Sequence, residues 1–254
     1  MTVAITRKIS PAISRCELTH LQREPIDVAL AAEQHAAYER RLADLGCRVV
    51  SLPTEPELPD SVFVEDTAIV VDELAVVTRP GAASRRRETP AVARVLAEHR
   101  PVATIKAPGT LDGGDVLRLG RRLFVGLSGR SNRAGIEQLH TLLSSHGYTV
   151  EALPFTGCLH LKSAVTQVAP DAVLLNPAWV GAVAFEGLRH IEIDPTEPYA
   201  ANALLVGDAV IYPVSFPRTA GRLERAGVRL VTVNVSELAK AEGAVTCCSL
   251  ILHD

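Results

Sequence analysis

The 254-residue sequence predicts an α/β protein in which one supersecondary unit is repeated five times. A short polar segment followed by an apolar run recurs at intervals of roughly 40 to 50 residues. After each of the first four recurrences, a short turn leads into a second apolar run. The polar segments align on Asp66, Asp115, Ser163, Asn202 and Cys248. If the units are related by rotation, these segments meet at one place, which would gather carboxylates, a histidine and a cysteine as in a nucleophilic active site.

Each pair of apolar runs is expected to form a β-hairpin, because polar or glycine-containing turns join the two runs. The second strands of the first four hairpins are expected at 74–78, 123–126, 172–175 and 209–212. Helices are expected at 89–99, 132–146 and 217–226, and each leads into another strand, at 102–105, 148–153 and 228–233. The helix at 132–146 has the clearest signal, since its leucines recur every three or four residues and Gly147 follows it. The unit is therefore strand, strand, helix, strand.

The fifth unit is split between the two ends of the sequence. Its first strand is expected at 248–252, and its remaining parts at 3–6, 27–45 and 47–52. Joining these segments closes the repeat into a ring and removes the exposed sheet edges of an open array. We therefore expect a single domain over residues 1–254. The alternative is an open α/β sheet in which the period arises by chance.

Composition excludes several classes of function. Hydrophobic residues make up 47% and charged residues 22%, which is ordinary for a soluble globular protein. A net charge of −3 and 4% aromatic residues argue against nucleic-acid binding, and no apolar run is long enough to span a membrane. The five cysteines are odd in number and lack the spacing of a structural zinc site. This usage favours a reduced, cytoplasmic protein without a metal.

Cys247 and His160 are the candidate nucleophile and proton carrier. A cysteine near an apolar strand is more often a packed core residue, but Cys247 occupies the same place in its block as His160 does in its own. A free thiol has a pKa near ~8.5 and needs a cation nearby to ionise at neutral pH, a role that a positively charged substrate could fill. Of the eight histidines, His160 is the one that lies inside a repeated block.

Acidic residues cluster near the same blocks. Asp60 and Asp115 could belong to simple turns, but Glu65 and Asp66 stand between two apolar runs. Adjacent buried carboxylates are costly unless they meet a cation, and a planar guanidinium fits several carboxylates best. Strand alternation would point Glu65 and Asp66 to opposite sides, so only a site at the end of a strand could use both.

Two arginines occupy equivalent positions in neighbouring units. Arg85 and Arg130 each follow the second strand of a unit and precede its helix. We therefore expect them to bind an anion, such as a substrate carboxylate. The neighbouring Arg86 and Arg87 are interpreted as a solvated surface pair.

Together these segments resemble the dimethylarginine dimethylaminohydrolase family of the guanidino-modifying superfamily, which includes the arginine deiminases. The resemblance rests on 58–66, 78–86, 111–115, 159–163 and 246–249, in order along nearly the whole chain. It implies a five-bladed α/β propeller of ββαβ units with pseudo-five-fold symmetry, the pentein fold. It also implies hydrolysis of N-omega-methylated arginine to citrulline and dimethylamine or methylamine, without a metal or organic cofactor. The implied partner is a small guanidino amino acid, and a homodimer is compatible with the resemblance.

The resemblance also implies a role for each candidate residue. Cys247 matches the nucleophile, His160 the general acid and base, and Asp112 the carboxylate of the triad. The implied substrate contacts are Glu65 and Asp66, with Asp66 at the guanidinium; Asp60 and the carbonyl of Leu18 near the α-amine; Arg85 and Arg130 at the α-carboxylate; and the backbone of Ala241. The chain departs from the expected pattern at Ala241, where a bulkier residue is usual, and at Glu242, where Asp is expected.

Three alternatives remain open at this point. The chain could be an arginine deiminase, which releases ammonia, or an amidinotransferase, which passes the amidino group to an amine. It could also be a non-enzymatic propeller that binds a small molecule and in which Cys247 is a buried core residue.

Overall fold

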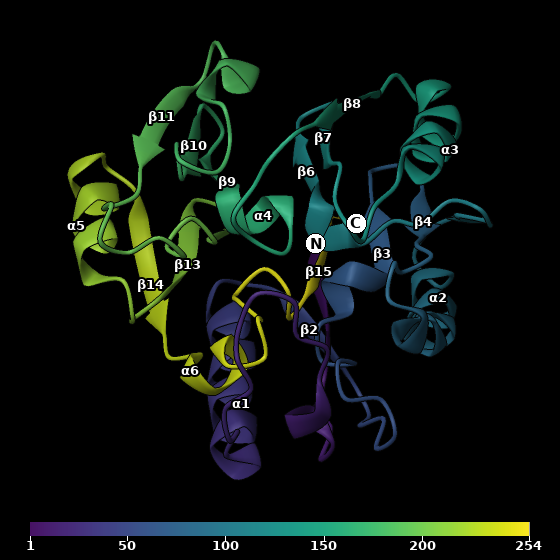
Figure 1. Cartoon of the computed structure of the whole chain (residues 1–254), viewed down its shortest axis with the longest axis horizontal. Coiled ribbons are helices and arrows are strands. Elements are labelled where there is room, and N and C mark those ends of the chain that lie inside the picture. The colour runs from purple at the N-terminus through teal and green to yellow at the C-terminus, as the bar shows by residue number, and fades with distance from the viewer. Residues whose placement is uncertain (254) are drawn as a thin grey trace.

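The computed structural model describes residues 1–253, and within them the strands form five three-stranded sheets arranged around the middle of the molecule (Figure 1). The first four sheets contain β3 (Ala68–Val70), β4 (Ala75–Val77) and β5 (Val102–Thr104); β6 (Val116–Leu119), β7 (Arg122–Gly126) and β8 (Thr149–Leu153); β9 (Val165–Ala169), β10 (Ala172–Leu175) and β11 (Arg189–Glu192); and β12 (Leu204–Val206), β13 (Ala209–Pro213) and β14 (Arg229–Val233). The fifth contains β15 (Leu250–His253), β1 (Thr2–Arg7) and β2 (Arg48–Leu52). The predicted α/β class is confirmed, and the fifth sheet joins strands from the beginning and the end of the sequence.

All five sheets have the same strand pairing. The middle strand pairs antiparallel with the first strand of its sheet and parallel with the third. A tight turn can join antiparallel strands, whereas parallel strands need a crossover. Four crossovers are helices, α1 (Val28–Asp44), α2 (Thr89–Leu96), α3 (Arg133–Ser144) and α5 (Pro217–Arg225). In the third sheet, a 3₁₀ helix (Ala182–Phe185) lies between β10 and β11, and neither it nor β11 was predicted from the sequence.

Helix α3 illustrates how the sequence sets these boundaries. The side chain of Asn132 caps its N-terminus by accepting a hydrogen bond from the Gly135 N–H at 2.8 Å, a bond whose loss typically costs about 1 kcal/mol. Leu139 and Leu143 are fully buried on its inner face. The chain turns away at Gly147, whose φ of +77° favours glycine.

The apolar core is divided into clusters that lie between neighbouring sheets. Val76 of the first sheet packs with Leu123 of the second, and Phe124 of the second packs with Val173 of the third. The remaining clusters join the third sheet to the fourth, the fourth to the fifth, and the fifth back to the first. Every sheet thus buries apolar side chains against both neighbours, and the series of contacts returns to its start.

The polar heads of the repeated blocks lie just before the first strand of each sheet, not inside it as the sequence suggested for Glu65 and Asp66. Residues Val64–Thr67 and Gly113–Asp115 form 3₁₀ helices, and α4 (Leu161–Ala164) directly precedes β9. The remaining short helices are Ile13–Arg15, Ala83–Glu88 and α6 (Ser236–Ala239). Within residues 1–253, no helix is long and apolar enough to cross a membrane.

Candidate active site

A small cavity brings most of the predicted site residues together. Its walls include Asp60, Asp66, Arg85, Arg130, His160, Ala241 and Cys247. Its volume is about 20 Å³, enough for roughly one water molecule. Asp112 lies behind the wall, fully buried, where it contacts His160. Leu18 and Glu65 are not among the lining residues, and their positions are described below.

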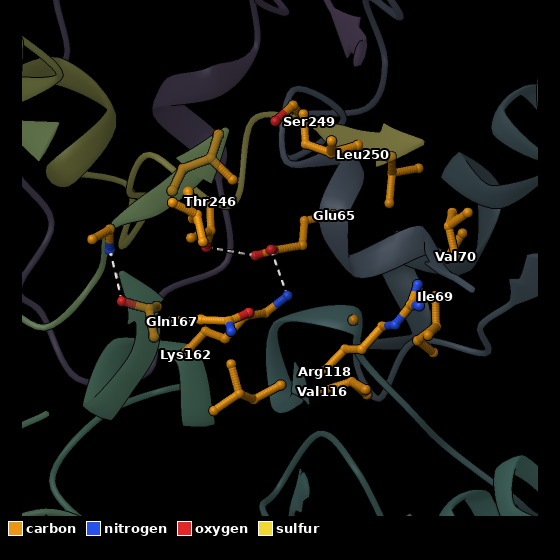
Figure 2. Close-up of a pocket in the computed structure, with 18 of the residues that line it drawn as sticks. Glu65, Ile69, Val70, Val116, Arg118, Lys162, Gln167, Thr246, Ser249 and Leu250 are labelled. Carbon is orange, nitrogen blue, oxygen red and sulfur yellow. Dashed lines mark hydrogen bonds and ion pairs between the residues drawn. The ribbon is translucent and has the colours of Figure 1, made fainter. Parts of the chain in front are cut away.

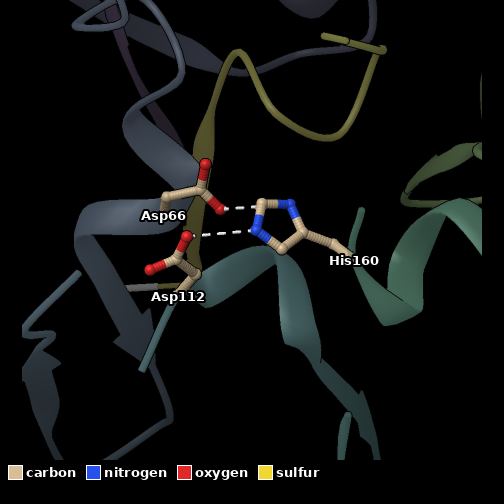
Figure 3. A group of neighbouring side chains, drawn as sticks. All are labelled: Asp66, Asp112 and His160. Carbon is tan, nitrogen blue, oxygen red and sulfur yellow. Dashed lines mark hydrogen bonds and ion pairs between the residues drawn. The ribbon is translucent and has the colours of Figure 1, made fainter. Parts of the chain in front are cut away.

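His160 is held between two carboxylates (Figure 3). Its Nε2 lies 3.1 Å from Oδ2 of Asp112, and its Nδ1 lies 3.8 Å from Oδ1 of Asp66. The imidazole fits only because residue 114 is glycine, since a Cβ atom there would lie 2.6 Å from Nδ1. The Gly114 N–H also donates to Oδ1 of Asp66 at 2.9 Å, so the same turn orients both side chains.

These contacts set the charge of the imidazole. Burial by itself would lower the pKa of His160, but Asp66 and Asp112 outweigh it and raise the pKa to about 9. Burial likewise opposes ionisation of Asp66, but His160 and Arg85 bring its pKa well below the ordinary value. At neutral pH the site therefore holds an imidazolium between carboxylates, and this imidazolium can donate a proton.

Cys247 lies in the loop before β15 and is half-buried. Its Sγ accepts a hydrogen bond from the Ala244 N–H at 3.4 Å, and its carbonyl accepts one from the Glu65 N–H at 3.1 Å. Burial, reinforced by Glu65 and Asp66, raises the pKa of the thiol to about 12. The unliganded protein therefore holds a protonated thiol, and a cation in the cavity would favour its ionisation.

Arg85 is placed differently from what the sequence suggested. Its side chain is 4% exposed, and its Nη1 lies 2.5 Å from Oδ2 of Asp66. Its other nitrogens donate to Glu88 and to the carbonyls of Asp60 and Phe63. The sequence predicted an arginine directed at a ligand anion, but in the structure its donors meet groups of the protein. The reason is that Glu88, three residues further on, is buried beside Arg85 and forms an ion pair with it. Burial raises the pKa of Glu88 to about 7, although Arg85 acts to lower it.

Arg130 borders the cavity without such an enclosure. Its side chain is 13% exposed, and its Nη1 lies 3.8 Å from Oδ2 of Asp112. Its Nη2 donates to the hydroxyl of Thr19 at 3.2 Å. Of the two arginines expected to hold an anion, Arg130 is the one with the more accessible guanidinium.

The chain around Leu18 approaches the cavity through the preceding residue. Glu17 lines the cavity, and its N–H donates to both carboxylate oxygens of Asp60 at 3.2 Å. Leu18 is half-buried and packs against the apolar cluster of the fifth sheet. Burial raises the pKa of Asp60 despite the nearby Arg85.

Glu65 lies in a second cavity, of about 400 Å³, whose walls include the first strands of all five sheets (Figure 2). One oxygen of its carboxylate is 2.5 Å from Nζ of Lys162, and the other accepts from the Thr246 hydroxyl at 2.8 Å. The resemblance implied that Glu65 and Asp66 both hold the substrate, with Asp66 at the guanidinium; in the structure the two residues line different cavities, and a substrate contact of Glu65 stays a prediction. Successive side chains of a 3₁₀ helix point about 120° apart, so adjacent residues in Val64–Thr67 face different ways.

Sequence reasoning gave no supporting role to two residues, Lys162 and Asp115. Lys162 neutralises Glu65, and a buried glutamate with no predicted cation was the signal for it. Asp115, which heads its block, is fully buried and accepts from Ser131 and from the N–H of Leu161. Asp115 thereby fixes the helix that begins directly after His160.

One group in the site has the composition of a metal ligand set. Asp66, Asp112 and His160 offer ligand atoms within 4.8 Å of one another. However, the carboxylates already accept hydrogen bonds from the N–H groups of Gly114 and Gly81, and Asp66 is paired with Arg85. The arrangement is therefore better suited to holding a protonated imidazole than a metal ion.

The fold and this cavity with its thiol, imidazole and carboxylates define the arginine deiminase class, and the family model described as arginine deiminase matches residues 33–197. The chain is 39% identical over 252 residues to N(G),N(G)-dimethylarginine dimethylaminohydrolase of Streptomyces coelicolor. This alignment covers 99% of this chain and 97% of the relative. It is 37% identical over 226 residues to the protein of the same name from Pseudomonas aeruginosa, covering 88% and 89% of the two chains. The chain therefore belongs to the dimethylarginine dimethylaminohydrolase family.

Solved structures agree with this assignment. A Cys-to-Ser mutant of the Pseudomonas aeruginosa enzyme, complexed with citrulline, matches with a TM-score of 0.92 at 34% identity over 98% of both chains. The N-terminal domain of ArgZ, an arginine dihydrolase of cyanobacteria, matches with a TM-score of 0.85 at 19% identity and supports the fold alone.

Proposed function

We propose that the protein hydrolyses N-omega-methylated arginine, as asymmetric dimethylarginine or monomethylarginine, to citrulline and dimethylamine or methylamine. The observation that carries this proposal is the cavity that joins Cys247 to the His160–Asp112 pair, in a chain 39% identical to a dimethylarginine dimethylaminohydrolase. The citrulline complex of the Pseudomonas aeruginosa relative supports a guanidino amino acid as the small-molecule ligand.

The five sheets are proposed to be the blades of one catalytic domain, a five-bladed α/β propeller with pseudo-five-fold symmetry. Two features support this arrangement: the identical strand pairing in every sheet, and the apolar clusters that pass from each sheet to the next and back to the first. In this arrangement the segments preceding the first strands converge near the axis, where a single site can use them all.

In the proposed reaction, binding of the guanidinium beside Asp66 brings a positive charge to the thiol. The thiol releases its proton to solvent, and the Cys247 sulfur forms a bond to the central guanidinium carbon. The imidazolium of His160 donates its proton to the substituted nitrogen as the carbon–nitrogen bond breaks. Dimethylamine or methylamine leaves, and a thiouronium remains on Cys247.

The second half of the reaction uses the same groups in reverse. Neutral His160 takes a proton from water, and the hydroxide oxygen adds to the thiouronium carbon. Collapse breaks the carbon–sulfur bond while the added hydroxyl loses its proton to solvent and becomes the carbonyl of citrulline. The released thiolate regains a proton from solvent. Asp112 orients the imidazole and stabilises its charged form throughout. These steps require neither a metal nor an organic cofactor.

The remaining residues are proposed to hold the amino-acid end. Arg130 is the best-placed partner for the α-carboxylate, and Asp60, the chain around Leu18 and the backbone of Ala241 surround the position of the α-amine. Arg85 contributes through Asp66, whose carboxylate it orients at 2.5 Å. For Glu65 we propose an indirect role, in which its N–H holds the carbonyl of Cys247. A cytoplasmic location and a homodimer stay predictions.

The test is an assay of purified protein with asymmetric dimethylarginine and, in parallel, unmodified arginine, following citrulline and released amine. Citrulline with dimethylamine from the first substrate and little product from the second is the expected result. Turnover of arginine would indicate a deiminase. With no turnover of either, and no amidino transfer to added amines, the proposed function would be wrong. Cys247→Ser, which preserves size, should lose nearly all turnover.

A further inference from the structure

Asp115 is a buried carboxylate to which the proposed reaction gives no role. It heads the second repeated block, at the place that Asp66 holds in the first. Its side chain is fully buried, and it does not line the cavity that holds Cys247. An ionised carboxylate in the interior is costly unless its oxygens are well bonded, so the groups that bond to it indicate what it does.

One oxygen of Asp115 holds the backbone beside His160. Its Oδ1 accepts a hydrogen bond at 3.1 Å from the N–H of Leu161, which lies in the next repeated block. Asp66 makes the same kind of bond one block earlier, to the N–H of Gly114 at 2.9 Å. Because Leu161 directly follows His160, the bond from Asp115 fixes the point from which the imidazole projects.

The other oxygen of Asp115 reaches two more site residues through serines. Its Oδ2 accepts hydrogen bonds from the hydroxyls of Ser128 and Ser131, each at 2.6 Å. The hydroxyl oxygen of Ser131 accepts from the N–H of Asp112 at 3.1 Å, and that of Ser128 accepts from the N–H of Arg130 at 2.9 Å. Each hydroxyl has a single proton, so both serines donate to Asp115 while their oxygens hold backbone N–H groups. This set of donors suits an ionised carboxylate.

The charge of Asp115 also acts on the imidazole. Burial lowers the pKa of His160, whereas Asp66, Asp112 and Asp115 all raise it. Burial in turn raises the pKa of Asp115, and the charge of His160 opposes that effect. Both groups are buried, so solvent screens the interaction between them only weakly.

Other ionisable groups also face His160, and they differ from Asp115 in position. Those in the cavity wall are Glu17, Asp60, Arg85, Arg130, Glu242 and Cys247. Behind the imidazole, the Cys158 thiol lies 3.4 Å from the carbonyl oxygen of His160, and Lys162 is paired with Glu65. Asp115 is bonded to the segments of both His160 and Asp112, so changing it perturbs this pair and leaves the wall residues in place.

We propose that Asp115 is a positioning residue for the reaction, which fixes the backbone of His160 directly and that of Asp112 through Ser131. The two segments it holds are those whose side chains meet at 3.1 Å, between Nε2 of His160 and Oδ2 of Asp112. The role rests on the proposed function, because it serves the acid and base of that reaction. The state of the imidazole can nevertheless be measured without turnover.

The test uses two variants and a control. Asp115→Asn keeps the size, removes the charge and replaces one acceptor oxygen by an amide that can only donate. Ser131→Ala keeps the charge and removes the link to Asp112, and it decides the case if Asp115→Asn does not fold. The control is Asp194→Asn, since Asp194 also accepts from a backbone N–H and a hydroxyl, both of Thr196, and does not line the cavity.

Two quantities are measured for each variant. One is the titration of the His160 ring by NMR, assigned with His160→Gln. The other is the pH dependence of kcat and KM with asymmetric dimethylarginine. In Asp115→Asn the titration midpoint should fall by about one pH unit, the effect of a nearby charge. The alkaline side of the kcat profile should move down with it, because the imidazolium is the acid.

The size of the kinetic effect separates positioning from binding. In Asp115→Asn, kcat at its optimum should fall at least about tenfold while KM changes less than about threefold, because the lost hydrogen bonds hold the acid and not the substrate. Ser131→Ala should lose about tenfold in kcat with a smaller shift of the midpoint, since the charge remains. Asp194→Asn should change neither quantity.

Several results would overturn the proposal. These are a wild-type kcat in Asp115→Asn or Ser131→Ala, a loss that lies entirely in KM, or an equal loss in Asp194→Asn. A lower kcat in Asp115→Asn with an unmoved His160 midpoint would show a structural role alone and would also overturn it. If the wild type has no turnover, the proposed function fails, while the titration still decides whether Asp115 sets the state of the imidazole.

Discussion

The reactivity of Cys247 should depend on the charge of the reagent more than on the reagent's chemistry. The perturbation is a pair of electrophiles of nearly equal size and shape, neutral 2-chloroacetamide and cationic 2-chloroacetamidine. Burial and the carboxylates of Glu65 and Asp66 raise the pKa of the thiol to about 12. A neutral reagent leaves this pKa unchanged, whereas a cation beside Asp66 lowers it.

The magnitude follows from the fraction of thiolate. At pH 7.5 an ordinary thiol with a pKa of ~8.5 is roughly one-tenth ionised, whereas a pKa of about 12 leaves roughly one part in 30,000. The higher basicity of the buried thiolate recovers about 30-fold to 50-fold, because nucleophilicity rises with pKa. Chloroacetamide should therefore label Cys247 about a hundredfold more slowly than an exposed thiol of ordinary pKa.

The assay measures labelling of Cys247 by mass spectrometry, in folded protein and in urea, over a range of pH. The ratio of cationic to neutral labelling in urea corrects for the intrinsic reactivity of the two reagents, and Cys247→Ser reports background from the other four cysteines. We expect this ratio to be at least ten times higher in the folded protein and to fall in Asp66→Asn. Equal ratios in the two states, or chloroacetamide labelling with an apparent pKa near 8.5, would refute the reasoning.

Three further predictions concern the charged groups around the site. Asp112→Asn should lower the pKa of His160 and reduce kcat about a hundredfold, the usual scale of a general acid or base, and the pH–rate profile should shift to lower pH on its alkaline side. An unshifted profile would count against the pairing. Lys162→Met should reduce the free energy of unfolding, measured by urea titration, by roughly 3–5 kcal/mol, because it leaves Glu65 buried and unpaired. The double variant that also carries Glu65→Gln should recover most of this loss. Because the folded-state pKa of His160, about 9, lies above the unfolded value, its contribution to stability is complete below pH ~6.5 and is lost as the pH rises through 9. The urea concentration at the midpoint of unfolding should therefore decrease as the pH is raised from 7 to 8.5. A decrease of the same size in His160→Gln would contradict this assignment.

The fold could be predicted wherever one local pattern decided it. Strand β10 occupies the residues expected for it, and α3 begins and ends within two residues of its prediction, because its cap and buried leucines are local signals. The crossover of the third sheet was missed because Ala182–Phe185 is too short to show a helical period.

The candidate site was harder to predict, because its geometry depends on contacts between distant segments. The sequence singled out Asp66, Cys247 and His160 but could not show that Glu65 faces another cavity, since that depends on a 3₁₀ helix where a strand was expected. Arg85 was assigned to a ligand because nothing in the sequence revealed that Asp66 would reach it. The roles assigned to these residues stay predictions until variants are measured.

The pairing of β1 with β15 has a consequence for the order of folding. Ile5 lies opposite Leu250, so this ladder joins residues nearly the full length of the chain apart, whereas the other four sheets are each assembled from one continuous stretch. Contacts with long sequence separation carry the largest loop-closure entropy and form late. The four local sheets should therefore form first and the fifth last. Since Cys247 lies three residues before β15, the reactive thiol would take its place only in the final step of folding.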